Sequence, residues 1–381
     1  MTDIKERKLN PYDPFDNPTE SCAYRTDYRR VDSRIEEAGY EIPILPDKTE
    51  RKGIRRLFNI TGLSLFLSAV GVNVIFMAVL VVLEVILAGS FDPNAMADAE
   101  TYINYDSSIL MAMNGMLFLA ANTLAAVVGG RLCGIRARSY YRPFEAKKSR
   151  LVGYIFIGIF VQALTGILYT FISGFLENAG IQDYVNDIDT YINAKTIIVT
   201  GLYTCIIAPV TEELLYRGFV LKNLSCVSQK FGIIVSAMLF GFAHENIAQF
   251  LLAMPIGIFM ARITIKHNSI IPSTLVHIGV NTIAFMLNWV YTVVPTDANG
   301  VPLMEGLGGL AVMGVDILYY LIAGVGMILW ILEVRRSRLP ANTIRQSYRG
   351  VRVALASPWL VAVCLFHTAM AVMGIVMQNM M

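Results

Sequence analysis

Six ionisable or amide side chains of this sequence lie inside long apolar segments, where such groups are uncommon. Together they supply two carboxylates, a guanidinium, two imidazoles and an amide: Glu212, Glu213, Arg217, His244, His277 and Asn281. On insertion scales, one ionised side chain at the centre of a membrane helix costs roughly 2.5–3.5 kcal/mol. We therefore expect these residues to have a chemical role that offsets this cost.

The spacing within each segment places these side chains on shared helix faces. Glu213 and Arg217 are four residues apart, with the acid before the base, an order that favours an ion pair. Glu212 points about 100° away from Glu213, so the two carboxylates can have separate roles. His277 and Asn281 are also four residues apart and share a face.

These residue types can hydrolyse a peptide bond without a Ser or Cys nucleophile. A carboxylate and an imidazole that share a water molecule, as Glu212 and His244 could, activate it for attack. A second imidazole and an amide, His277 and Asn281, can donate hydrogen bonds to a developing oxyanion. Glu212, His244 and His277 also form a set that could ligate Zn²⁺. The segment "HENIA" is not HExxH, because Ala248 stands at its last position, so no metal is required by the pattern.

The composition indicates a membrane protein. Of the 381 residues, 55% are hydrophobic and 16% are charged, whereas about a quarter of a soluble domain is charged. The five cysteines form no CxxC pair, which argues against a disulfide framework or a thiolate zinc site. The first residues contain no apolar stretch typical of a cleavable signal peptide.

Apolar periodicity and length predict an all-α, polytopic helical membrane protein with about nine transmembrane helices. The expected spans are 58–88, 108–130, 151–175, 196–221, 231–245, 248–265, 270–294, 308–333 and 356–378. The candidate site residues fall on the fourth, fifth and seventh of these helices. Pro209 is expected to kink the fourth helix one turn before the glutamates.

Four parts can be distinguished along the chain. Residues 1–56 are polar and rich in proline, and we expect a largely disordered cytoplasmic tail. Residues 57–149 contain two helices and a basic loop, and residues 296–381 contain the last two helices. The part between them, 150–295, contains all the candidate site residues and is expected to be the catalytic core.

The loops predict an orientation. Basic connections such as "RLCGIRARSYYRPFEAKKSR" alternate with connections that are acidic or lack Lys and Arg, such as "LENAGIQDYVNDIDTYINA". The positive-inside rule then places the N-terminus in the cytoplasm and, after nine spans, the C-terminus outside. At about 1.5 Å per residue, Glu212, His244, His277 and Asn281 lie roughly 15, 20, 13 and 20 Å from the cytoplasmic surface, so three helices bring them to a similar depth.

The three motifs EExxxR, FxxxH and HxxxN occur in this order at positions 212–217, 240–244 and 277–281. In this order and on separate membrane helices, they resemble the CAAX-protease and bacteriocin-processing family (CPBP, Abi) of intramembrane endopeptidases. The resemblance covers roughly residues 150–295. Members of this family have been described both as metalloproteases and as glutamate-dependent proteases without metal.

The resemblance implies a role for each matching residue. Glu212 would be the general base that positions the attacking water together with His244. His277 and Asn281 would stabilise the oxyanion. Three further residues would support the site: Glu213, Arg217 and Phe240.

The activity that the resemblance implies is hydrolysis of membrane-associated peptides or proteins, lipidated or bacteriocin-like, in a prokaryotic plasma membrane. No cofactor is required by the residues, with Zn²⁺ as the open alternative, and no nucleic-acid partner is expected. Two other classes stay open: a proton-coupled transporter that uses Glu212, His244 and His277 as a relay, and an inactive scaffold or bacteriocin-immunity protein. Outside the motifs, we expect Glu245 to be solvated and His367 to be a packing histidine.

Overall fold

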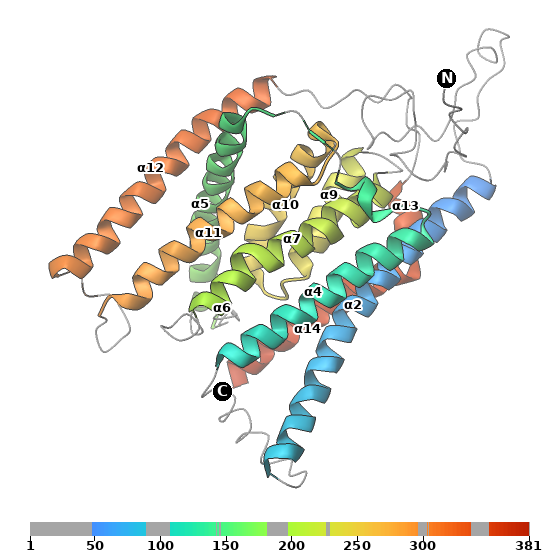
Figure 1. Ribbon diagram of the computed structural model, residues 1–381, viewed down its shortest axis with the longest axis horizontal. Helices are drawn as coiled ribbons and strands as arrows, with labels where there is room; N and C mark the ends of the chain where they lie inside the picture. Colours follow the sequence, from blue (N-terminus) through green and yellow to red (C-terminus); the bar gives the residue numbers. More distant parts are fainter. Residues whose placement is uncertain are drawn as a thin grey trace, which may run out of the picture.

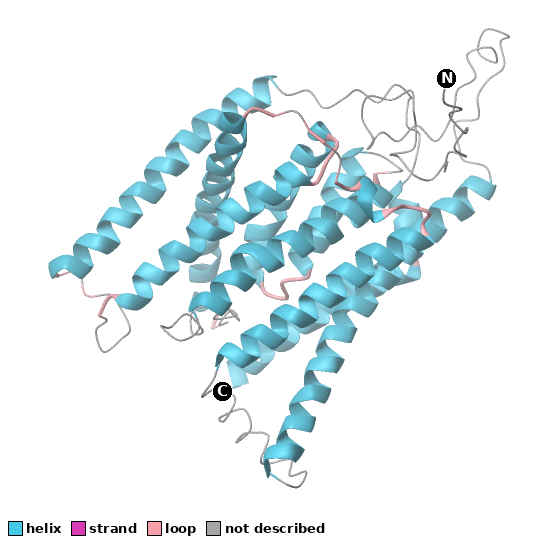
Figure 2. Ribbon diagram, viewed as in Figure 1, coloured by secondary structure: helices cyan, strands magenta, loops and turns pink. Residues whose placement is uncertain are grey.

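The computed structural model describes residues 48–88, 107–141, 143–144, 146–180, 197–225, 229–295, 303, 305–336 and 350–380. Within these ranges all regular structure is helical, as Figure 2 shows, which confirms the predicted all-α class. Most of the predicted N-terminal tail lies outside the described residues. The first helix begins at Lys48, inside the stretch expected to be tail, because its Lys-, Glu- and Arg-rich start has high helix propensity.

Eight helices of the described residues are long and apolar enough to cross a membrane. Seven of them are α2 (Lys48–Ala88), α4 (Ser107–Leu132), α5 (Lys148–Asn178), α10 (Ile247–His267), α11 (Ile271–Val293), α12 (Gly306–Arg336) and α14 (Pro358–Met380). The eighth, Ile197–Leu224, consists of α6 (Ile197–Leu202), η3 (Tyr203–Ile207), α7 (Ala208–Glu212), η4 (Glu213–Val220) and α8 (Leu221–Leu224). Three shorter elements are η1 (Ala137–Ser139), α9 (Gln229–Phe242) and α13 (Gly350–Leu355).

The fifth of the nine expected spans, 231–245, is not among these eight helices. It corresponds to α9, which has 14 residues and ends at Phe242. At 1.5 Å per residue this helix is about 21 Å long, less than the hydrocarbon core of roughly 30 Å. His244 therefore lies in the connection between α9 and α10, and its prediction on the fifth helix is wrong.

The helices pack side by side in one bundle (Figure 1). The helices α2, α4 and α14 lie together on one side, and α5 and α12 pack against each other on the other side. The helices that carry the candidate site lie between these groups. The start of α2 and the end of α14 lie at opposite ends of the bundle.

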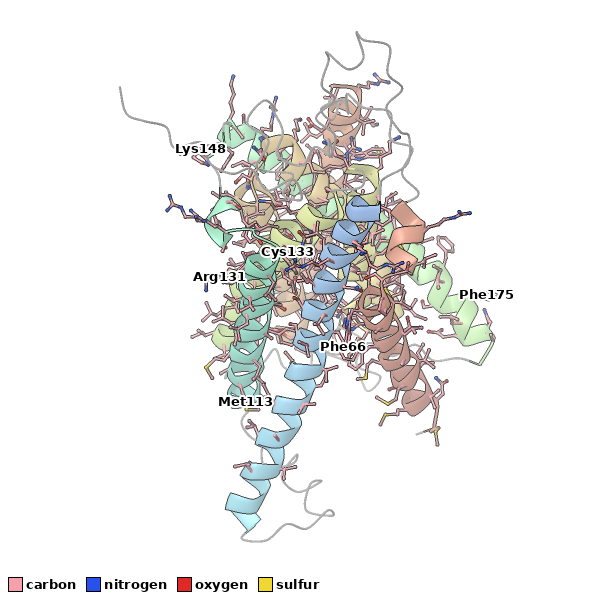
Figure 3. All side chains as sticks on the ribbon, turned by 90° about the vertical axis from the view of Figure 1, so that its right-hand side faces the viewer. Phe66, Met113, Arg131, Cys133, Lys148 and Phe175 are labelled. Atoms are coloured by element: carbon pink, nitrogen blue, oxygen red, sulfur yellow. The ribbon has the colours of Figure 1, made fainter. Side chains whose placement is uncertain are left out.

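Hydrogen bonds between polar side chains join the helices at the end of the bundle where α2 begins. The amide of Asn223, at the end of α8, donates to Thr61 Oγ1 at 3.0 Å and to Cys133 Sγ at 3.4 Å. Figure 3 shows Arg131 and Cys133 near the upper end of α4 and Met113 near its lower end. Because unpaired polar groups are costly in an apolar interior, these bonds favour one arrangement of α2, α4 and α8.

Candidate active site

The helix that carries both glutamates is not a uniform α-helix. Two π-helical segments, η3 and η4, lie on either side of the short α7, and Pro209 lies in the first turn of α7. Segments of π-helix inside α-helices are often found at functional sites. The irregularity that the sequence predicted near Pro209 is thus a change of hydrogen-bonding pattern, which the proline alone does not indicate.

Pro209 leaves a backbone acceptor for Asn281. In η3 the N–H of Ala208 donates to the carbonyl of Tyr203, five residues earlier. In this register the carbonyl of Thr204 faces Pro209, which has no N–H to donate. The side-chain amide of Asn281 donates to this Thr204 carbonyl at 3.0 Å. This bond uses one of the two amide hydrogens of Asn281, so the amide has a second hydrogen to donate.

Glu213 and Arg217 form an ion pair in the protein interior. Arg217 Nη1 lies 3.3 Å from Glu213 Oε1, and the two side chains are 1% and 0% exposed. The guanidinium also lies over the ring of Phe240, at 4.3 Å from its centroid, and donates to Met260 Sδ at 3.8 Å. A desolvated guanidinium over an aromatic face gains cation–π stabilisation, so Phe240 stabilises the charge as well as packing.

Gly257 makes room for this guanidinium. A Cβ at this position would lie 3.3 Å from Arg217 Nη2 and 3.1 Å from the Cβ of Ala237. The absent side chain thus lets α10 approach α9 at the depth of the ion pair. Neither Gly257 nor Met260 was identified from the sequence. The small-residue spacing of Ala253, Gly257 and Ala261 on α10 is the signal that could have indicated a close helix contact.

His277 lies between the two glutamates. Its Nδ1 is 3.2 Å from Glu213 Oε1, and its Nε2 is 3.7 Å from Glu212 Oε2. A buried carboxylate paired with arginine accepts hydrogen bonds, so Nδ1 donates to Glu213 and Nε2 is directed toward Glu212. The Glu212 side chain is 21% exposed, whereas that of Glu213 is fully buried, so Glu212 is the carboxylate that water can reach.

The ring of His244 is fixed through Phe240. Its Nδ1 lies 2.8 Å from the carbonyl of Phe240, which only accepts, so Nδ1 carries the hydrogen and a neutral ring has its lone pair on Nε2. Phe240 contacts His244 and His277 edge-to-face, with centroids 4.9 and 5.9 Å apart. Within the described part of the chain, Glu212 contacts His277 but forms no direct hydrogen bond with His244.

The three residues suggested as zinc ligands, Glu212, His244 and His277, do not form a metal-binding group. No set of three or more His, Cys, Asp or Glu side chains among the described residues is arranged to hold a metal ion. The Nδ1 atoms of His244 and His277 are used by Phe240 and Glu213, as described above. Hydrogen-bonded Nδ1 atoms are also usual for histidines that bind zinc through Nε2, but the Nε2 atoms are not gathered with Glu212 into a group of three among the described residues, and we derive no step through a metal.

Three residues outside the motifs also have partners in the structure. Glu245, expected to be solvated, lies with its Oε1 2.9 Å from Nδ1 of His367 on α14. Glu245 is partly exposed and also has a partner, because the connection after α9 turns it toward α14. Asp316 of α12 accepts a hydrogen bond from the hydroxyl of Tyr291 at 2.7 Å.

With eight helices long and apolar enough to span a bilayer, this is an integral membrane protein with a site of carboxylates and imidazoles between its helices. Residues 194–283 match a family model described as Rce1-like, type II CAAX prenyl endopeptidase. This segment contains all three motifs, so the match confirms the resemblance to the CAAX-protease family over this part of the chain. No curated protein and no solved structure matches the chain.

Proposed function

We propose that this protein is an intramembrane endopeptidase that hydrolyses peptide bonds of membrane-associated peptides or proteins with water activated by Glu212 and His244. The observation that carries the proposal is the position of His277, which contacts both glutamates of the first motif inside the helix bundle. This arrangement joins a base, Glu212, an orienting acid, Glu213, and a hydrogen-bond donor, His277, in one network.

In the proposed reaction, Glu212 accepts a proton from a water molecule whose other polar contact is Nε2 of His244. The resulting hydroxide attacks the carbonyl carbon of the scissile peptide, and a tetrahedral oxyanion forms. When the C–N bond breaks, the proton held by Glu212 passes to the leaving amine. General base catalysis of this kind contributes about 10²–10⁴ in rate.

The oxyanion would be stabilised by His277 and Asn281. His277 donates to Glu213 through Nδ1, and its Nε2 would be the donor to the oxyanion. The second amide hydrogen of Asn281 would be the other donor. Arg217 keeps Glu213 ionised and in place, so the ion pair acts on the reaction through His277.

We propose a cytoplasmic N-terminus and substrates cut near the inner leaflet of a prokaryotic plasma membrane. Basic residues lie at the ends of α4, α8, α10 and α12 and at the beginnings of α2, α5 and α9. Figure 1 shows that these seven helix termini lie on the same side of the bundle. They include Lys52, Arg131, Lys148, Lys222, Lys230, Lys266 and Arg335. An excess of Lys and Arg on one side is typical of the cytoplasmic face. Lipidated and bacteriocin-like peptides both meet this description of a substrate.

The test compares new peptide termini in membranes from cells that express the wild-type chain and the Glu212→Gln chain at matched levels. The amide of Gln cannot accept the proton of water, so termini that depend on this carboxylate should be absent from the variant. Such termini would identify the substrates at the same time. Identical termini from both chains, each folded and abundant, would refute the protease and direct attention to proton-coupled uptake.

A further inference from the structure

The connection between α9 and α10, residues 243–246, has an unusual backbone. Glu245 has a φ of +57°, in the left-handed region that residues other than glycine rarely adopt. This residue directly follows His244, which contributes the second group of the proposed water site. A strained residue persists only where the surrounding structure holds it, so the contacts of Glu245 decide how His244 is presented.

Several hydrogen bonds hold this connection internally. The N–H groups of His244 and Glu245 donate to the carbonyls of Gly241 and Phe242, each at 3.1 Å. The side chain of Asn246 donates to the carbonyl of His244 at 2.9 Å and accepts from the N–H of Gln249 at 2.7 Å. Irregular backbone at membrane depth requires such partners, because lipid offers none. These bonds fix the shape of the connection but leave its position relative to the other helices to side-chain contacts.

The side chain of Glu245 makes such a contact with α14. Its Oε1 lies 2.9 Å from Nδ1 of His367, and these side chains are 24% and 7% exposed. His367 lies 122 residues further along the chain and outside the matched segment 194–283. The motifs of the site therefore do not include this contact.

The helix α14 is itself firmly held. It packs along α2, and a Cβ added to Gly62 of α2 would lie 2.3 Å from the backbone nitrogen of Leu360, so the two backbones are in close contact. Phe66 of α2 also packs against the rings of Trp359 and Phe366, with centroids 5.6 and 5.7 Å away. His367 follows Phe366 directly, so its ring is carried by a well-packed part of the helix.

We propose that Glu245 and His367 are a positioning pair, through which α14 holds the connection 243–246 and so directs the ring of His244 toward Glu212. Neither residue touches the reacting atoms, and both act through His244. Without the pair, Glu245 can leave the left-handed region, and the ring of His244 moves with the backbone. The consequence for turnover rests on the proposed function, but the positioning of His244 does not.

The test uses diethyl pyrocarbonate, which acylates neutral imidazole nitrogens, on the purified full chain in detergent micelles. The modification rate of His244 is measured by peptide mass spectrometry relative to that of His267, which lies at the end of α10 and away from the connection. The variants are Glu245→Ala, His367→Ala and the combination of both. His367→Asn is the conservative variant, because its side-chain N–H lies where Nδ1 of histidine does. Thr368→Ala, on the exposed part of the same helix, is the matched control.

We expect the relative rate at His244 to change by at least about twofold in both single variants, the lower end of the coupling between contacting residues. The double variant should change it no further, and His367→Asn should return it toward the wild-type value, while Thr368→Ala leaves it unchanged. If Glu245→Ala does not fold, the variant that combines Glu245→Gln with His367→Ala is measured in its place. Unchanged labelling of His244 in folded His367→Ala would overturn the proposal, as would additive effects in the double variant.

Once a cleaved peptide is known, the same variants should lower kcat by at least about twofold and leave KM unchanged. A purely structural contact would lower the amount of folded protein without altering kcat per folded molecule. If no Glu212-dependent cleavage exists, the proposed protease function fails, but the modification rates still decide whether the pair positions His244.

Discussion

The ion pair of Glu213 and Arg217 allows a prediction about stability that does not depend on catalysis. The substitution Arg217→Met removes the guanidinium, keeps most of the side-chain volume, and leaves Glu213 fully buried beside His277. Breaking a buried ion pair on one side costs about 3–5 kcal/mol, because the remaining charge is uncompensated. The hydrogen bond from His277 to Glu213 compensates in part, so we expect about 3 kcal/mol, the lower end of this range. This corresponds to roughly a 150-fold change in the folding equilibrium.

The free energy of unfolding can be measured by titrating the protein in mixed micelles with a denaturing detergent and following tryptophan fluorescence. The matched control is Glu213→Gln combined with Arg217→Met, which removes both charges and should lose less stability than Arg217→Met alone. If Arg217→Met lowers the unfolding free energy by less than about 1 kcal/mol, or if the double variant is the less stable of the two, Arg217 does not stabilise the protein by compensating the buried charge of Glu213.

Three further predictions concern the proposed reaction, measured on a peptide identified by its Glu212-dependent termini. Asn281→Ala should lower kcat by about 10²–10³ through loss of an oxyanion donor, and a rate within threefold of wild type would contradict this role. Pro209→Ala supplies an N–H that competes with Asn281 for the Thr204 carbonyl. We therefore expect kcat to fall, but by less than in Asn281→Ala. The helix should also become more stable to thermal unfolding. A chelator such as 1,10-phenanthroline should leave the initial rate unchanged, and inhibition reversed by added Zn²⁺ would show that a metal takes part.

Much of the fold could be predicted from the sequence, because membrane helices are long apolar segments that the sequence shows directly. Apolar runs and alternating basic loops predicted the crossings, and the four-residue spacing of Glu213 and Arg217 predicted a shared face. The π-helical segments did not follow, since a change from i→i+4 to i→i+5 bonding is selected by contacts with other helices, such as that between Thr204 and Asn281. A sequence also has no local signal for a pair like Glu245 and His367, which meet only when α14 packs beside α9.

The end of α9 was also mispredicted for a physical reason. The residues "AHEN" after Phe242 contain neither proline nor glycine, the usual indicators of a break. The helix stops because Asn246 caps α10 through the N–H of Gln249 and because Glu245 is held in the left-handed region. His244 consequently belongs to a constrained loop, where its ring direction depends on several neighbours rather than on helix geometry alone.

The π-helical segment η3 determines the direction in which the side chains of α7 and η4 point relative to those of α6. Successive residues of an α-helix are turned by about 100°, and a π segment accommodates them at a smaller angle than this. If the same residues, Tyr203 to Ile207, formed a regular α-helix, each would turn further, and Glu212 would be rotated relative to α6. Either the glutamates would face away from His277, or α6 would present a different face to its neighbours. The hydrogen-bonding pattern of this stretch is therefore as important to the site as the identity of the residues that follow it.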